Sequence, residues 1–410
     1  MSENISIIDS DKTFTTLVFY TEFLQKLSLF YKENPFEEIK FKLFQNGDED
    51  IYNSQYRIDP ISIPLLLSIL EQLSKFHKKP LDLLLYNNKA TIDALQFLFR
   101  SGFFKNAGNY KDLTFQSKNI LSFDERYLGA FSDHLIRKDH IIRSYSKNDL
   151  NLNFKTSSYQ EEITLRDHIL SIISYKVREH YAELLFDNEY TLKAYNLYID
   201  ILSELITNGI LHSGSTTYSM MFVDRFKCKF SISDNGIGLR KSLESKSSDN
   251  FYYKKGAFKS SVRIKSDVFN PLFIDNLIDI FETLYYSSLK ERRGLFDLML
   301  NVVLTSNGYF RLHTDNCQII ISNRIFKYLD KLHECREHIF EIHNSYELNK
   351  IESKEYQKIL IVQAENIKSM FNSLLERTIE YYSEESKYSA IRFFNVKFKG
   401  VHIEVEIPNI

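Results

Sequence analysis

Apolar and polar positions alternate at helical spacing most clearly between residues 190 and 214. The apolar positions of this stretch are Tyr198, Leu202, Leu205, Ile206 and Gly209. A second row of polar residues steps by four through Asp200, Glu204 and Asn208, and side chains at this spacing share one face of a helix. The pattern therefore predicts an amphipathic helix that carries a carboxylate and an amide on the same face.

Two strands and a turn are predicted after this helix. Apolar runs indicate strands over residues 218–223 and 226–233, and the second strand leads into DNGIGL, residues 234–239. Gly236 and Gly238 let the backbone turn tightly. A helix with Glu-x-x-x-Asn, followed by a strand pair that ends in Asp-x-Gly-x-Gly, resembles the GHKL superfamily of ATPases. Within that superfamily, the chain is most similar to the ATP-binding modules of anti-sigma-factor kinases and histidine kinases.

This resemblance implies a site for ATP and Mg²⁺ and a role for each matching residue. Glu204 takes the place of the catalytic base that orients the attacking water, and the side-chain carbonyl of Asn208 takes that of the Mg²⁺ ligand. Asp234 matches the carboxylate that accepts a hydrogen bond from the adenine amine. The other cofactor-binding positions that the resemblance implies are Gly236, Gly238, Arg293, Gly294 and Leu295. The phosphate loop departs from the family pattern, because Phe296 follows Leu295 where a further glycine is usual.

The amino-terminal part alternates short strands and helices. The pattern predicts a helix within residues 1–35, a strand over 41–44 and a helix over 65–76. A strand over 81–86 and a helix over 91–100 follow, and this order indicates a small α/β domain. The segments IDPISIPLLLSILEQLSK, PLDLLLYNN and FLFRSGFF, within residues 40–105, resemble the STAS-like domains that precede some bacterial GHKL modules.

Ser62 is the candidate phosphate acceptor in this domain. In anti-anti-sigma STAS domains, a Ser just after the corresponding Asp is phosphorylated by a GHKL kinase. Here Asp59 is followed by Pro60, Ile61 and Ser62, so the acceptor position is displaced. The alternative interpretation is a generic α/β domain in which Ser62 caps a helix.

The carboxyl-terminal half continues the ATPase pattern with an interruption. Residues 240–293 are interpreted as a polar lid that contains an apolar helix over 271–287. The further predicted elements are a helix over 295–304, strands over 309–313 and 318–322, inserted helices over 324–388, and strands over 391–397 and 401–407.

We therefore predict the α/β (α+β) class and four segments. Residues 1–153 form an amino-terminal helix, a STAS-like α/β domain and a connector. Residues 154–323 and 389–410 together form a GHKL-type α/β sandwich that binds ATP, and residues 324–388 form a helical insertion between its two parts.

Composition and charge narrow the function further. The 410 residues carry a formal net charge of −2, which gives no general attraction to nucleic acid or to anionic membranes. No apolar run reaches the length of a membrane span, and no signal-peptide pattern opens the sequence. Three scattered cysteines indicate no disulfide framework. We expect a cytoplasmic protein that binds ATP or ADP and a protein partner. We expect it to bind neither membranes nor nucleic acid. Whether the chain forms a homodimer is left open by the sequence.

Four functions are considered for such a module. The preferred function is a conformational switch, in which ATP binding orders residues 240–293 and a partner or the amino-terminal domain reads the change. The alternative is a serine/threonine kinase that resembles anti-sigma-factor kinases. A sensor histidine kinase would need an acceptor His followed by its usual neighbours, which neither His168 nor His180 has. A DNA-acting ATPase would need a further domain after the last predicted strand.

Overall fold

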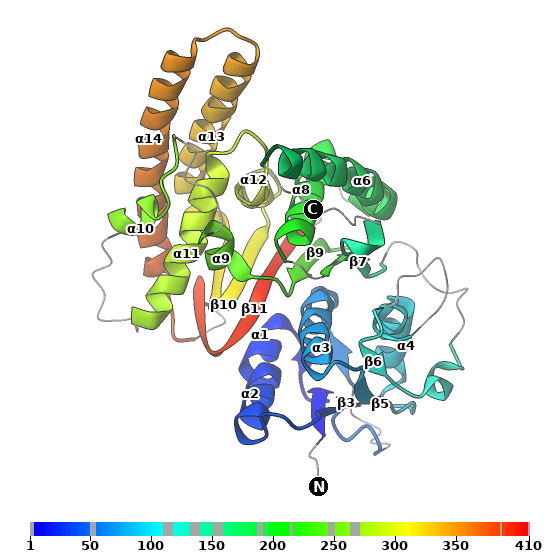
Figure 1. Ribbon diagram of the computed structural model, residues 1–410. Coiled ribbons are helices and arrows are strands. Elements are labelled where there is room, and N and C mark those ends of the chain that lie inside the picture. Colours follow the sequence, from blue (N-terminus) through cyan, green and yellow to red (C-terminus); the bar gives the residue numbers. More distant parts are fainter. Residues whose placement is uncertain are drawn as a thin grey trace.

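The computed structural model describes residues 4–49, 55–109, 118–131, 140–150, 159–186, 192–193, 195–213, 216–244, 251–262, 271–385 and 388–408. Among the described residues, helices surround a four-stranded parallel sheet, a two-stranded parallel sheet and a five-stranded antiparallel sheet, which confirms the predicted mixed α/β class. Figure 1 shows the amino-terminal unit, in blue and cyan, packed against one side of the larger sheet. In the part of the chain that the structure describes, no helix is long and apolar enough to cross a membrane.

The amino-terminal unit is built on a parallel sheet with the strand order β1-β3-β5-β6. Its strands are β1 (Ile5–Ile8), β3 (Lys40–Phe44), β5 (Leu81–Leu84) and β6 (Leu121–Ser122). Its helices are α2 (Leu24–Glu33), α3 (Ile63–His77), α4 (Ile92–Arg100) and α5 (Phe103–Ala107). The predicted strands near residues 41 and 81 and the helices near residues 65 and 91 are therefore confirmed.

The first 35 residues differ from their prediction as helix. The chain opens with strand β1, which pairs in parallel with β3, and with the short strand β2 (Thr13–Phe14), which pairs with β4 (Arg57–Ile58). Helix begins only at α1 (Thr16–Val18), where the Thr15 side chain accepts a hydrogen bond from the first turn. It continues through a π-helical turn into α2. The β-branched isoleucines of β1 are buried, and this burial in a parallel sheet favours the extended conformation.

The second sheet is antiparallel and has the strand order β10-β11-β9-β8-β7. Its strands are β7 (Arg143–Tyr145), β8 (Thr217–Val223), β9 (Lys227–Asp234), β10 (Tyr309–Ile321) and β11 (Ile391–Pro408). Each of the two predicted strand pairs after residue 308 merges into one long strand. Strand β7 pairs with β8, so the sheet takes up residues before the predicted boundary at 154.

Both faces of the antiparallel sheet are covered. One face packs against α6 (Tyr159–Phe186), α8 (Tyr195–Ser213), α11 (Pro271–Ser288) and α12 (Leu295–Leu300) in a single apolar cluster. The other face contributes Tyr218, Met220 and Phe398 to the apolar core of the amino-terminal unit. Phe398 meets the ring of Phe19 edge to face, with 6.0 Å between the ring centroids. Helix α3 lies across β8 and β9 on this second face.

Helix α11 changes the interpretation of residues 240–293 as a lid. The helix forms where it is predicted, but Leu277, Phe281 and Leu284 are completely buried in the main core. The described residues before it, 251–262, are also docked on it, because the Tyr253 hydroxyl and the Lys259 backbone N–H both donate to Glu282. A helix buried in this way is part of the core of this structure, and its ordering on ATP binding stays a prediction.

The predicted insertion over 324–388 is a helical hairpin. Helices α13 (Phe326–Glu347) and α14 (Ser353–Glu380) pack side by side and project from the sheet in Figure 1. Buried residues along most of both helices, from Leu329 to Ile342 and from Tyr356 to Leu375, belong to the main apolar cluster. The hairpin is therefore continuous with the core.

The packing of the amino-terminal unit on the sheet predicts the effect of one substitution. Phe398→Ala should lower the free energy of unfolding by about 3–5 kcal/mol, because it empties a fully buried aromatic site between the two units. Phe36→Ala is the matched control, since that ring is 87% exposed. Denaturant unfolding followed by circular dichroism measures both, and equal stabilities would contradict this packing.

Candidate functional site

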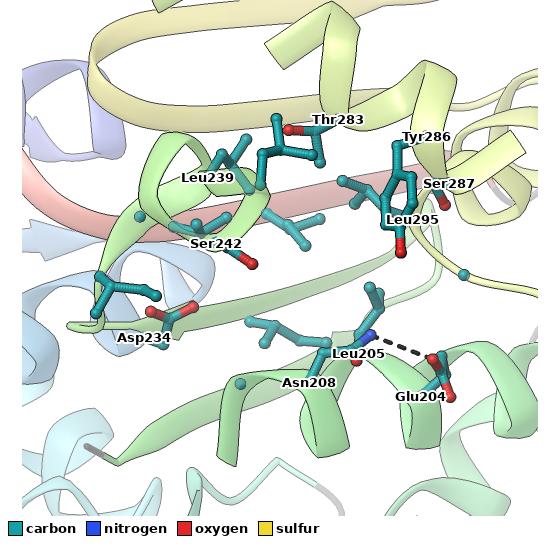
Figure 2. Close-up of a pocket in the computed structure, with 18 of the residues that line it drawn as sticks. Glu204, Leu205, Asn208, Asp234, Leu239, Ser242, Thr283, Tyr286, Ser287 and Leu295 are labelled. Carbon is teal, nitrogen blue, oxygen red and sulfur yellow. Dashed lines mark hydrogen bonds between the residues drawn. The ribbon is translucent and has the colours of Figure 1, made fainter. Parts of the chain in front are cut away.

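A cavity opens between α8, the turn after β9, and α11. Its apolar wall consists of Leu205, Ile232, Ile237, Leu239, Leu243, Leu295, Val401 and Ile403. Polar side chains are set at its ends and rim. Figure 2 shows Asp234 at one end and Glu204 at the other, with Asn208 between them on α8. Thr283, Tyr286 and Ser287 of α11 face them from the opposite side.

The cavity brings together most of the residues selected from the sequence. Those that line it are Glu204, Asn208, Asp234, Gly238, Gly294 and Leu295. Gly236 is not among the lining residues, but its backbone N–H donates a hydrogen bond to the Asp234 carboxylate over 2.8 Å. Arg293 lines a neighbouring cavity that shares Glu204 with the first. The predicted positions thus converge on two adjoining cavities, although they come from three separate segments of the chain.

The turn after β9 is held by close backbone contacts. Gly238 has a φ of +78°, a left-handed conformation that glycine adopts without strain. Gly400 lies directly against the backbone of Asp234, where a side chain would collide with the carbonyl group. Strand β11 can therefore pair with β9 up to the end of that strand, which fixes Asp234 at the mouth of the cavity.

Burial raises the pKa of Asp234 from its usual 3.8 to about 6. Hydrogen bonds from the backbone N–H groups of Gly236 and Val401 oppose this shift, because they stabilise the ionised form. The group is therefore a carboxylate at neutral pH that is poorly solvated and turned toward an apolar wall. Such an acceptor favours a ligand that brings its own N–H donor.

Glu204 and Asn208 form a small network with a residue that the sequence patterns did not indicate. The Asn208 side-chain N–H donates to Glu204 over 3.3 Å, so its carbonyl oxygen is left for another partner. Arg166 of α6 forms an ion pair with the same carboxylate, which is nearly fully buried. Arg166 precedes Glu204 by 38 residues, and no local spacing connects them. The ion pair places a guanidinium against the Glu204 carboxylate beside the cavity.

The neighbouring cavity is strongly charged. Arg292 and Arg293 line it together with Asp167, Asp200 and Glu291. Arg292 is paired with Asp167 over 2.7 Å, and Arg293 lies 3.3 Å from Glu337. The two cations thus stand beside Glu204 but are held by acidic partners at the surface. A polyanion that enters here would compete with those partners for the guanidinium groups.

A fully buried arginine from the helical hairpin shapes the loop between α11 and α12. Arg336 donates to the carboxylate of Asp297 at 3.0 and 3.1 Å and to the backbone carbonyls of Ser288, Lys290 and Arg292. These contacts hold the segment that carries Arg293 and Gly294. The helical pattern over residues 324–388 does not distinguish Arg336 from the other charged residues of that segment. Only the position of α13 over this loop gives it a structural role.

The turn that carries Asp234 is also tied to the amino-terminal unit. The Asn235 side-chain N–H donates to the Ser68 carbonyl and to Glu71, each over 3.2 Å, and both partners belong to α3. Ser68 also reaches the Ser233 hydroxyl over 3.1 Å, and Thr216 donates to Glu71 over 2.8 Å. Neighbouring residues of one turn therefore face two ways, with Asp234 toward the cavity and Asn235 toward α3.

No family model, no curated protein and no solved structure matches this chain.

The raised pKa of Asp234 predicts a pH-dependent change in stability. Because the folded protein holds this proton more tightly than the unfolded chain does, the contribution is present at low pH and is lost as pH rises through about 6. Asp234→Asn cannot ionise, so without ligand it should be more stable than the parent by about 1–2 kcal/mol at pH 7.5, allowing for partial solvation. Below about pH 4 the two proteins should be equally stable.

Thermal unfolding from pH 4 to pH 8 measures this difference. Asp330→Asn, on the exposed face of α13, is the control and should follow the parent at every pH. If the Asp234→Asn curve also follows the parent, the carboxylate is not buried in solution as it is in the structure.

Proposed function

We propose that the paired cavities bind ATP with Mg²⁺ and that the chain is a nucleotide-dependent conformational switch of the GHKL type. The observation that carries this proposal is the convergence of Glu204, Asn208 and Asp234 on one cavity. Their order along the chain, on a helix and then after a strand, is also the order of the corresponding residues in the superfamily that the sequence resembles.

The Asp234 end suits a purine base. The apolar wall offers flat packing for a ring, and the poorly solvated carboxylate accepts a hydrogen bond from an exocyclic amine. Adenine presents such an amine, whereas guanine has a carbonyl oxygen at that position of the ring. Adenine is therefore the preferred base.

The other end suits phosphates. Lys290 lines the first cavity, and Arg292 and Arg293 line the second. Asn208 offers an uncharged oxygen that would hold Mg²⁺ without repelling the phosphates, and the bound ion would neutralise part of their charge. Glu204, which is paired with Arg166, would orient a water molecule for hydrolysis.

The amino-terminal unit is the proposed reader of the nucleotide state. Asn235 is covalently next to the base-binding residue and bonds to α3 through Ser68 and Glu71. A small movement of the turn on nucleotide binding would alter these buried bonds directly. This route does not need the buried helix α11 to become ordered.

The alternative proposal, a serine/threonine kinase that phosphorylates its own amino-terminal unit, receives less support. Ser62 is completely buried, and its hydroxyl donates to the carbonyl groups of Asp59, at 2.7 Å, and Phe14, at 3.2 Å. Phosphate transfer to Ser62 would require this part of the unit to open. A separate protein substrate would not meet this obstacle.

Three substitutions test nucleotide binding by calorimetry and by release of phosphate from ATP. Asp234→Asn should weaken ATP binding by about 1–3 kcal/mol, because the accepting oxygen facing the amine can be replaced by a donor. Asn208→Ala should weaken binding by about tenfold, and only when Mg²⁺ is present. Glu204→Gln should bind ATP as the parent does but hydrolyse it about a hundredfold more slowly.

Asn196→Ala, on an exposed position of the same helix, is the matched control and should behave as the parent. Absence of ATP binding by the parent would end the proposal. Transfer of labelled phosphate to protein instead of water would establish the kinase alternative.

The switch is tested by hydrogen exchange of α3. Addition of Mg-ATP should change the exchange rates of backbone amides in residues 63–77 of the parent protein, because the bonds from Asn235 adjust. Asn235→Ala should still bind ATP within about threefold of the parent affinity, but the response of α3 should be lost. If ATP binds to the parent and α3 exchange stays unchanged, the amino-terminal unit does not read the nucleotide.

A further inference from the structure

A second cluster of ionisable side chains is buried on the opposite face of the antiparallel sheet. His313 of β10 pairs in register with His402 of β11, and Glu404 follows two residues later on the same face. The histidines are completely buried and Glu404 is 3% exposed. One ligand atom from each residue lies within 4.8 Å of the other two. None of the three belongs to the proposed nucleotide site.

The distances within this cluster suit a shared ion. His402 Nε2 lies 3.1 Å from one oxygen of Glu404, and His313 Nε2 lies 3.9 Å from the other. Around a tetrahedral metal with bonds of about 2.0–2.1 Å, neighbouring ligand atoms are about 3.3 Å apart. The two observed separations lie on either side of that value but involve different oxygens of Glu404. Rotation of the carboxylate and of the two rings would bring one oxygen and both Nε2 atoms to one centre.

The hydrogen bonds of the cluster leave buried polar atoms without partners. Among the described residues, the Nδ1 atoms of His313 and His402 and the hydroxyl of Tyr20 make no hydrogen bond, although all three are buried. The Tyr20 ring stacks on His313, with 5.4 Å between the ring centroids. Unsatisfied groups are rare in protein interiors, so the buried Tyr20 hydroxyl beside His313 indicates that this cluster takes a further polar partner.

We propose that His313, His402 and Glu404 bind one divalent transition-metal ion of the zinc class. Two imidazoles and one carboxylate are a common ligand set for Zn²⁺, with the fourth position taken by water. Such a water would also give the Tyr20 hydroxyl a hydrogen-bond partner.

Both histidines can present an unprotonated Nε2 atom to a metal ion, and the total number of protons on the cluster need not change. Arg392 donates to the Gln318 side-chain oxygen, so the Gln318 side-chain N–H points at His313 Nε2 and marks that atom as an acceptor. The metal would displace this N–H. His402 would change tautomer, because the proton it directs at Glu404 from Nε2 would move to its free Nδ1.

The site would join the two units of the protein. Thr16, the first residue of α1, donates its hydroxyl hydrogen to Glu404, and Tyr20 lies one turn later. Arg311 approaches Glu404 to 3.7 Å, but it also lies 3.9 Å from Glu406, so its charge keeps a carboxylate partner when the metal binds. Because the ligands are inaccessible to solvent, the ion should exchange slowly and remain bound through purification.

The test measures zinc in the full-length protein. Protein from Zn²⁺-supplemented cells is desalted, and its metal content is determined by mass spectrometry. The parent should retain about one Zn²⁺ per chain, and His402→Ala and Glu404→Gln should each retain at least about tenfold less. Glu404→Gln keeps the side-chain shape and an acceptor for Thr16, so it serves if His402→Ala does not fold.

His343→Ala is the matched control, because His343 is a buried histidine whose two ring nitrogens already have partners, Tyr356 and the Leu289 carbonyl. It should retain zinc as the parent does. Removal of zinc by a chelator under mildly destabilising conditions should lower the Tm of the parent but not that of Glu404→Gln. A parent protein that holds no more zinc than Glu404→Gln would overturn the proposal and leave the cluster as a hydrogen-bonded contact.

Discussion

The structure depends on burying both faces of one antiparallel sheet. A sheet with one solvent-exposed face alternates apolar and polar residues, whereas β8 is buried at every position except Phe222 and β9 is buried continuously from Phe230 to Ser233. Helices cover one face, and the amino-terminal unit must cover the other. The two units therefore share a core, and the polar residues on the shared face need partners there. Lys229 of β9 meets Asp59 at 3.0 Å, and Glu404 of β11 meets Thr16.

The same constraint places the proposed nucleotide site. Strand β9 ends between the two layers, so the turn that follows it touches the helical layer with Asp234 and α3 with Asn235. A change at the cavity is thus one residue away from the interface between the units. If ATP binds as proposed, the amino-terminal unit needs no long-range pathway to respond, because the buried bonds to Ser68 and Glu71 are already in contact with the turn.

The helical hairpin contacts the opposite end of the site, at the loop between α11 and α12. Arg336 reaches from α13 into the loop before α12 and satisfies three backbone carbonyls as well as Asp297. A buried guanidinium is stable only when its donors are used, so the loop and the hairpin constrain each other. His343 adds a contact to the Leu289 carbonyl in the same loop. A partner that moved the hairpin would therefore move the residues beside Arg293.

The sequence by itself determined the elements whose residues follow a short, regular spacing along the chain. The row from Glu204 to Asn208, the strands around it, the turn at Asp234 and the inserted helices all follow from spacings of two, three or four residues. Tertiary structure alone decided which of these elements is core and which polar groups meet. Helix α11 looks like part of a lid by composition but is buried, and strand β7 joins a sheet whose next strand begins 72 residues later, at Thr217. Arg166 with Glu204, Arg336 with Asp297 and Thr16 with Glu404 are separated along the chain by 38, 39 and 388 residues. Contacts at such separations leave no mark in the local pattern, because they depend on how whole layers pack.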